Sequence, residues 1–345
     1  MKCAVALVMT VLLAGQERRF QVQARLVQVP VTVTDSRGRT VDGLEAADFI
    51  ILDNGRSQKG IVDVLNTGVA PIALIAAVQT SGISEPVLAK VRKIGSMIQP
   101  LITGEFGCGA VMSFAERVRW EQECTNNPDL LIAAFEGLQP GEHRIAHMLD
   151  AAAEAIDRLR RRPNARRILL LISETRDRGS ETSLDAVVAA AQTADVSVYA
   201  ATYSAFRTAF TAKQSETEPT RVPKGMPPGG KGPDTPPNLT KYPVPPPEQR
   251  VDILGGIGEL ARLGKTNTTQ VLAGQTGGAT FSFTRQKGLE DAIERLGAEL
   301  HSQYVLSFRP DRPAPGYHRL EVRVNRPGRI RTRSRPGYWL AGEAP

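Results

Sequence analysis

Cysteine, histidine and aromatic residues are scarce in this sequence. Three cysteines among 345 residues are too few for a fold held together mainly by disulfides. Four histidines leave little scope for histidine-rich metal chemistry. Aromatic residues form only 5% of the chain, which argues against a surface that stacks single-stranded nucleic acid. Beyond residue 15, no apolar run reaches the roughly 18 residues of a membrane-spanning helix, so no transmembrane span is predicted.

Hydrophobic residues, in contrast, make up 41% of the chain and charged residues 23%, as in a folded protein with one large domain or two. The net charge of +7 raises the question of a nucleic-acid or membrane-surface partner. The positive charge is unevenly spread, because segment 204–250 carries +3 and the tail 309–345 carries +6. The remainder is slightly acidic in sum, so we expect no specific nucleic-acid partner.

The first 15 residues have the composition of a secretory signal. Lys2 supplies a positive charge, an apolar run follows from Cys3 to Leu13, and small residues come next. We therefore expect residues 1–15 to direct export to the periplasm or the extracellular space; the alternative is a buried first strand or helix. Gln16 stands where a lipoprotein signal requires cysteine, so lipid anchoring is not expected.

Cys108 and Cys124 lie in a predicted hairpin. Residues 107–114 and 118–124 are both typical of strands, and a tight turn near Glu116 would place the two cysteines almost opposite each other. Export to an oxidising compartment favours a disulfide between them. The alternative is two separate buried thiols, since a free cysteine behaves as a small apolar residue.

The two ends of the chain are predicted to be β-structure. Residues 20–66 are rich in valine, alternate in polarity and contain the hairpin signal Asp53-Asn54-Gly55. Residues 303–340 return to strand patterns after a long helical region. We expect the two segments to pair as one antiparallel, sandwich-like module built from both ends of the chain.

The central segment, 68–301, alternates buried strands with amphipathic helices. Continuous apolar runs at 72–78, 168–172 and 196–200 predict strands that are covered on both faces. This order predicts an α/β fold with a doubly wound, mostly parallel sheet and helices on both faces, as in Rossmann-like domains. Segment 204–250 holds 11 of the 24 prolines and predicts a flexible insertion, which a further helix at 251–263 follows.

The strand ends carry a recognisable order of polar residues. Gln79-Thr80-Ser81-Gly82-Ile83-Ser84 follows the first buried strand, a hairpin and a helix entry at Gly141 come next, and Ser173-Glu174-Thr175-Arg176-Asp177 ends a later strand. This order resembles the von Willebrand factor type A domain. Asp48-Phe49 near the amino end and Arg335-Pro336-Gly337-Tyr338 near the carboxyl end are similar to the bacterial (acidobacterial) VWFA-related family. The resemblance implies a protein that binds protein partners at its strand ends.

Members of that family often hold a divalent ion in a metal-ion-dependent adhesion site, built from an Asp-x-Ser-x-Ser loop, a threonine and a further aspartate. In this chain, Gln79 replaces the first aspartate, Ser81 matches the first serine, and Ser84 comes one place late. The threonine position falls near Ile145 or Ala146, neither of which has a side-chain oxygen. Mg²⁺ requires about six oxygen ligands. We therefore expect a degenerate site without a cofactor, with weak Mg²⁺ binding as the alternative.

Glu174 stands at the position of the family's last aspartate, and Asp177 follows it closely. His143 and His147 are four residues apart at a helix start, a spacing found in some zinc sites, and Glu174 or Asp177 would supply a third ligand. That arrangement would suit a metal-dependent hydrolase. The simpler interpretation is two partly exposed histidines beside hydrogen-bonded polar residues.

Four arginines near the carboxyl end alternate along a predicted strand: Arg329, Arg331, Arg333 and Arg335. Alternation places them on one face, either as a solvated surface or as a stripe for an anionic polymer of an envelope scaffold. The sequence thus predicts an exported, non-enzymatic protein that binds a protein partner. The predicted contact residues are Gln79, Ser81, Ser84, His143, Glu174 and Asp177.

Overall fold

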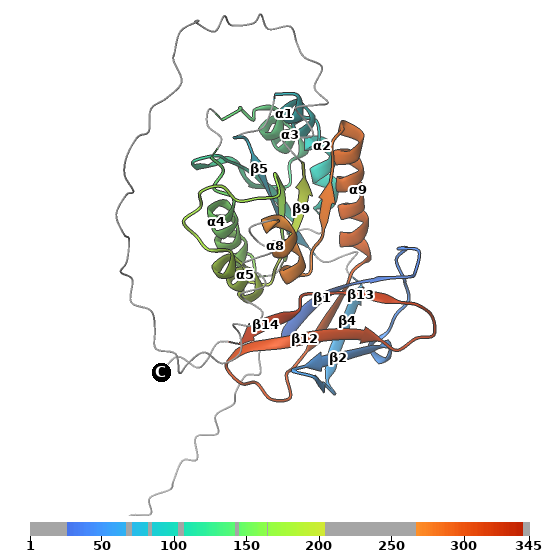
Figure 1. The fold of residues 1–345 in the computed structure, drawn as a ribbon. Coiled ribbons are helices and arrows are strands. Elements are labelled where there is room, and N and C mark those ends of the chain that lie inside the picture. Colours follow the sequence, from blue (N-terminus) through green and yellow to red (C-terminus); the bar gives the residue numbers. More distant parts are fainter. Residues whose placement is uncertain are drawn as a thin grey trace, which may run out of the picture.

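The computed structural model describes residues 26–66, 71–81, 85–102, 107–141, 145–163, 165–203 and 267–340. The predicted signal 1–15, the proline-rich segment 204–250 and the predicted helix 251–263 lie outside these residues, as do Ser84 and His143. Figure 1 shows an α/β domain packed against a β module. Among the described residues, no helix combines the length and apolar character needed to cross a membrane.

A six-stranded sheet forms the centre of the α/β domain, in the order β10-β9-β8-β5-β6-β7. Its strands are β5 (Ile72–Gln79), β6 (Cys108–Phe114), β7 (Val118–Thr125), β8 (Arg166–Ser173), β9 (Val196–Thr202) and β10 (Thr280–Ser282). Neighbouring strands are parallel except β6 and β7, which form the predicted hairpin. Strands β5, β6 and β9 are buried along their whole length, as their continuous apolar sequences require.

Helices cover both faces of this sheet. One face packs against α1 (Glu85–Arg92), α2 (Gly95–Ile98), the 3-10 turn η3 (Gln99–Leu101), α3 (Pro128–Glu136) and α9 (Gln286–Ser302). The other packs against α4 (Met148–Arg160), α5 (Leu184–Thr193) and α8 (Thr268–Thr276). Local sequence fixes several helix starts, because the side chains of Asn127, Ser183 and Asn267 accept hydrogen bonds from the first turns of α3, α5 and α8.

The β module consists of two four-stranded sheets, in the orders β13-β1-β11-β4 and β14-β12-β2-β3. Its elements are β1 (Val27–Thr34), η1 (Ala46–Asp48), β2 (Phe49–Asp53), β3 (Arg56–Ser57), β4 (Ile61–Asn66), β11 (Tyr304–Phe308), β12 (Gly316–Val324), β13 (Arg331–Arg333) and β14 (Gly337–Leu340). Strands from the two ends of the chain pair directly, β1 with β11 and β2 with β12, and enclose one apolar core. The α/β sheet with this antiparallel module confirms the fold class predicted from the sequence.

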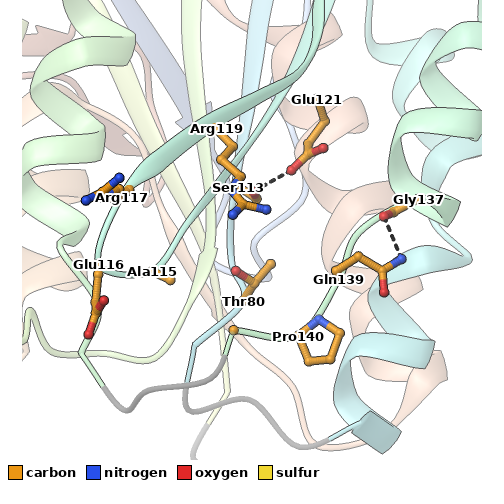
Figure 2. A pocket seen from close by; sticks show the side chains of 11 residues that line it. Thr80, Ser113, Ala115, Glu116, Arg117, Arg119, Glu121, Gly137, Gln139 and Pro140 are labelled. Atoms are coloured by element: carbon orange, nitrogen blue, oxygen red, sulfur yellow. Dashed lines mark hydrogen bonds between the residues drawn. The ribbon is translucent and has the colours of Figure 1, made fainter.

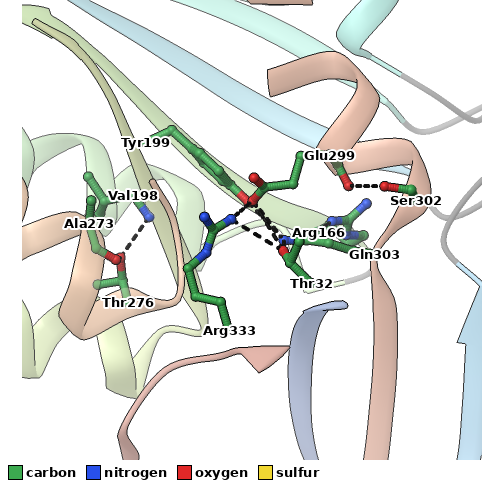
Figure 3. Close-up of polar contacts among 10 residues, drawn as sticks. All are labelled: Thr32, Arg166, Val198, Tyr199, Ala273, Thr276, Glu299, Ser302, Gln303 and Arg333. Carbon is green, nitrogen blue, oxygen red and sulfur yellow. Dashed lines mark hydrogen bonds and ion pairs between the residues drawn. The ribbon is translucent and has the colours of Figure 1, made fainter. Parts of the chain in front are cut away.

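A polar cluster joins the module to the α/β domain (Figure 3). The carboxylate of Glu299, on α9, accepts hydrogen bonds from Thr32 of β1, Tyr199 of β9, Gln303 and Arg333 of β13. Arg166, at the start of β8, donates to the carbonyl of Leu300. The module therefore contacts the amino ends of the parallel strands, and their carboxyl ends lie at the far end of the domain.

At the same junction, the four arginines of the predicted stripe differ in exposure and in their partners. Arg329 and Arg331 are exposed. Arg333 pairs with Glu299, and Arg335 is buried, donating to the carboxylate of Asp195 and to the carbonyls of Gln28 and Gln192. The predicted exposed stripe of four arginines is therefore not formed, because the α/β domain covers half of it.

Candidate functional site at the strand ends

Gln79 links the ends of two neighbouring strands. It is the last residue of β5, and its side chain is buried. Its amide nitrogen donates to the carbonyl of Ser81 at 2.9 Å, and its amide oxygen accepts from the backbone N–H of Glu174 at 2.9 Å. Both ends of the amide are therefore engaged, which a carboxylate at this position could not achieve because it has no donor.

Ser81 follows in the same loop and is fully buried. Its hydroxyl has no hydrogen-bond partner among the residues described. The loop is held from both sides, since the N–H of Thr80 donates to Phe114 at 3.0 Å and the N–H of Gly141 donates to Thr80 at 3.0 Å. Gly141 packs tightly against this loop, since a Cβ there would be 3.3 Å from the Cα of Ser81.

Glu174 directly follows β8 and is buried with one ion-pair partner. Its carboxylate lies 2.7 Å from the guanidinium of Arg178, which is about half exposed. Burial raises the pKa of Glu174 above its ordinary value, and the charge of Arg178 opposes that shift. Burial and the nearby Glu174 charge raise the pKa of Tyr203, whose buried hydroxyl lacks a hydrogen-bond partner within the described structure.

Asp177 has a different role from Glu174. One of its oxygens accepts from the N–H of Leu149 at 3.1 Å and from the Ser180 hydroxyl at 2.6 Å. The other accepts from the N–H of Ser180 at 3.2 Å. Asp177 therefore caps the first turn of α4 and closes its own loop, which leaves its oxygens occupied by this chain.

His147 directly precedes α4, and its side chain lies near a carboxylate of that helix. Its Nδ1 lies 3.7 Å from a carboxylate oxygen of Asp150. Nearby, Ile145 is 43% exposed and Ala146 is buried, so the position of the family's threonine offers no side-chain oxygen. Ala146 instead exchanges two backbone hydrogen bonds of 3.1 Å with Arg178, which ties the loop before α4 to the loop after β8.

These residues do not fit the divalent ion that the sequence resemblance implies. The ion requires several free oxygen ligands. Gln79 and Asp177 use theirs within the chain, and Glu174 is paired with Arg178. Across the described ranges, no three histidine, cysteine, aspartate or glutamate side chains are grouped to hold a metal. The structure thus brings Gln79, Ser81, Glu174, Asp177 and the His147 loop to one end of the sheet without converging carboxylates.

A polar cleft opens beside this group, and sequence reasoning did not identify it. Its volume is about 470 Å³, and it lies between the β6–β7 hairpin and the loop at 137–141 (Figure 2). The residues that line it are Thr80, Ser113, Ala115, Glu116, Arg117, Arg119, Glu121, Gly137, Gln139, Pro140 and Gly141. The hairpin was predicted, but only the fold shows that the loop after α3 forms the opposite wall.

Both walls of the cleft are fixed by internal contacts. Arg92 of α1 donates two hydrogen bonds, of 3.0 and 2.7 Å, to the carbonyl of Leu138 in the loop wall. A disulfide between Cys108 and Cys124 joins the two strands of the hairpin wall, with 5.3 Å between the Cα atoms. This confirms the disulfide that the sequence favoured. The hairpin is held at its base, and its tip borders the cleft.

Comparisons with known proteins give only distant likenesses. No protein-family model matches the sequence, and no curated protein matches it. Among solved structures, proximal thread matrix protein 1 from the mussel byssus is 10% identical over 78% of this chain, with a TM-score of 0.42; the chain covers 50% of that protein. A structure of the same protein with a zinc-occupied MIDAS motif is 12% identical over 72% of this chain and covers 49% of that one, with a TM-score of 0.42.

A bacterial protein is similar at the same level. BatB from Bacteroides thetaiotaomicron is 15% identical, with a TM-score of 0.37, and the match covers 66% of this chain and 99% of BatB. This chain thus spans about half the length of the mussel protein and nearly all of BatB. At these identities and TM-scores, the ligands and partners of those proteins are not assigned to this chain.

Proposed function

We propose that the protein is an exported, non-enzymatic binding protein that contacts a protein partner through its strand-end face without a metal ion. The observation that carries this proposal is the position of Gln79, whose neutral amide bridges Ser81 and Glu174 at the centre of that face. A neutral amide whose two ends both form hydrogen bonds within the chain offers no charge to a divalent ion. The strand-end face therefore contacts its partner through side chains and backbone, without a bound metal ion.

Two features of the same face support contact with a protein. Ligands of doubly wound sheets bind outside the carboxyl ends of the strands, which is where the polar cleft opens. Ile145, in the loop before α4, exposes an aliphatic side chain where the family has a metal ligand. An apolar contact flanked by polar groups is typical of protein interfaces.

Export is supported by the sequence of residues 1–15 and by the disulfide, because disulfides persist in oxidising compartments. The test is a fusion of residues 1–25 to a reporter that is active only outside the cytoplasm. Reporter activity is expected. A reporter that stays silent, while the same reporter with a known secretory signal is active, would contradict export.

Partner binding is tested by capture from an envelope extract of the source cells, with the purified chain immobilised. We expect one or more proteins to be retained by the wild type in buffer with chelator and lost from the double variant Ser81→Ala, Glu174→Ala. The matched control is Asp157→Ala with Arg160→Ala, an exposed ion pair of 2.6 Å at the far end of α4. Capture that survives the strand-end change, or that requires Mg²⁺, would overturn the proposal.

A further inference from the structure

We propose that the cleft between the β6–β7 hairpin and the 137–141 loop binds an extended segment of the partner that carries one isolated acidic residue, with Arg119 receiving its carboxylate. This rests on the proposed function, because the cleft opens on the same strand-end face. It adds the chemistry of the ligand and a recognition residue that the sequence resemblance does not assign.

Arg119 is an unpaired cation among the residues that the structure describes. Its side chain is exposed and makes no hydrogen bond or ion pair within the described structure. Two further arginines at this end of the domain are engaged, Arg92 with Leu138 and Arg178 with Glu174. Figure 2 shows the guanidinium of Arg119 turned toward Ser113, while the side chain of Arg117 points away. A guanidinium presents five donors in a planar fork that matches a carboxylate.

Glu121 limits which anion can enter. It lies two residues further along β7, on the same face as Arg119, and its carboxylate accepts from the Ser113 hydroxyl at 2.5 Å. Side chains two apart on a strand are separated by about 7 Å. A polyanion bound to Arg119 would place its next negative charge beside the carboxylate of Glu121, which repels it. In contrast, a peptide with one acidic residue and a basic residue two positions later would pair its acidic side chain with Arg119 and its basic side chain with Glu121.

The remaining walls fit a peptide better than a sugar or a base. Gln139 donates through its amide nitrogen to the carbonyl of Gly137 at 3.0 Å, which leaves its amide oxygen to accept a peptide N–H. No aromatic side chain is among the described residues that line the cleft, so a stacking platform is absent from them. The fixed walls reduce the entropy lost on binding, because neither has to be ordered by the ligand.

The first test measures peptide binding to the full purified chain by fluorescence polarisation. The probe is the labelled, end-capped peptide Ala-Ala-Asp-Ala-Lys-Ala-Ala. We expect saturable binding that Arg119→Gln weakens by about tenfold, since a charge-assisted bidentate contact is lost. Arg331→Gln is the matched control, with the same charge change at an exposed arginine of β13 that does not line the cleft, and is expected to leave affinity within about twofold. Circular dichroism checks that each variant is folded.

Three results would overturn the proposal. The first is no binding of the probe, or equal binding of a peptide with asparagine in place of aspartate. The second is equal weakening by Arg119→Gln and Arg331→Gln, which would indicate general electrostatic attraction. The third is tighter binding of polyglutamate than of the probe, which would indicate a polyanion surface. In support of the proposal, Glu121→Gln is expected to improve polyglutamate binding.

The partner-capture experiment separates this proposal from the proposed function. Loss of capture in both Arg119→Gln and the Ser81→Ala, Glu174→Ala variant supports the two together. Capture that is lost in the double variant but kept in Arg119→Gln leaves the strand-end function standing and removes the cleft from it. Capture that is kept in both variants overturns the proposed function itself.

Discussion

The amide oxygen of Gln79 accepts a hydrogen bond of 2.9 Å from the backbone N–H of Glu174, which joins the carboxyl ends of β5 and β8. The amide nitrogen of the same side chain donates to the Ser81 carbonyl at 2.9 Å. One buried glutamine thus connects the loop after β5 to the loop after β8. The separation of these two loops, and so the shape of the strand-end face, depends on this side chain.

Replacing Gln79 by methionine should destabilise the protein. Methionine has a similar volume but leaves the N–H of Glu174 and the carbonyl of Ser81 buried without these partners. Such unpaired groups cost about 1–3 kcal/mol each, so we expect the free energy of unfolding to fall by about 2 kcal/mol or more in urea titrations. Gln139→Met, at an exposed position, should change it by less than about 0.5 kcal/mol. Equal stability of the two variants would contradict the bridging role.

Glu174 should make stability depend on pH. Burial raises its pKa in the folded protein above the ordinary value of 4.5. A carboxyl whose folded pKa is raised contributes stability that is fully present below the unfolded pKa and is lost as the pH rises through the folded pKa. The variant Glu174→Gln cannot ionise, so its stability relative to the wild type should increase over the pH range above the ordinary pKa of 4.5. A difference that stays constant across this range would show that the raised pKa does not affect stability.

Sequence pattern was sufficient where one local signal decides the structure. The apolar runs at 72–78 and 196–200 predicted β5 and β9. Helix α8 was not predicted, because threonines occupy three of its buried positions and its sequence lacks a clear apolar stripe. One of them, Thr276, satisfies its hydroxyl by donating to the carbonyl of Leu272 at 2.8 Å, which only the folded helix makes available.

The candidate site was predictable as a place but not as a set of contacts. The strand ends identified Gln79, Glu174 and Asp177 as neighbours, since carboxyl ends of parallel strands share one edge. That Asp177 caps α4, and that Arg178 pairs with Glu174, follows from loop conformations that no periodicity encodes. The arginine stripe was misjudged for a related reason: alternation gives the face of a strand, whereas the docking of a second domain decides whether that face is exposed.

Removing the disulfide should weaken both the fold and the cleft. The variant Cys108→Ala with Cys124→Ala opens a loop with a sequence separation of 16. A closed loop of that size stabilises by about 3 kcal/mol, and we expect a loss of that order in urea titrations. Because the disulfide holds one wall of the cleft, binding of the peptide Ala-Ala-Asp-Ala-Lys-Ala-Ala should also weaken. The unfolded, unreduced wild type should show no free thiol from this pair, and two thiols would contradict the bond.

Glu299 and Arg333 should stabilise the junction as a unit. Arg333 of the β module donates to the carboxylate of Glu299 in the α/β domain, where Thr32, Tyr199 and Gln303 also donate. Glu299→Gln removes the negative charge, and Arg333→Gln removes the positive one. Because Glu299 is largely buried, each change should lower the free energy of unfolding by about 2 kcal/mol.

The two changes together should cost about as much as either alone, because both remove the same ion pair. A double-mutant cycle in urea titrations measures this coupling. Arg331→Gln, an exposed arginine on the same strand, is the control and should change stability by less than about 0.5 kcal/mol. Fully additive losses would mean that the pair is not coupled. Equal losses from Arg331→Gln and Arg333→Gln would mean that only the overall charge matters, and the contact across the junction would then not be what holds the module against the α/β domain.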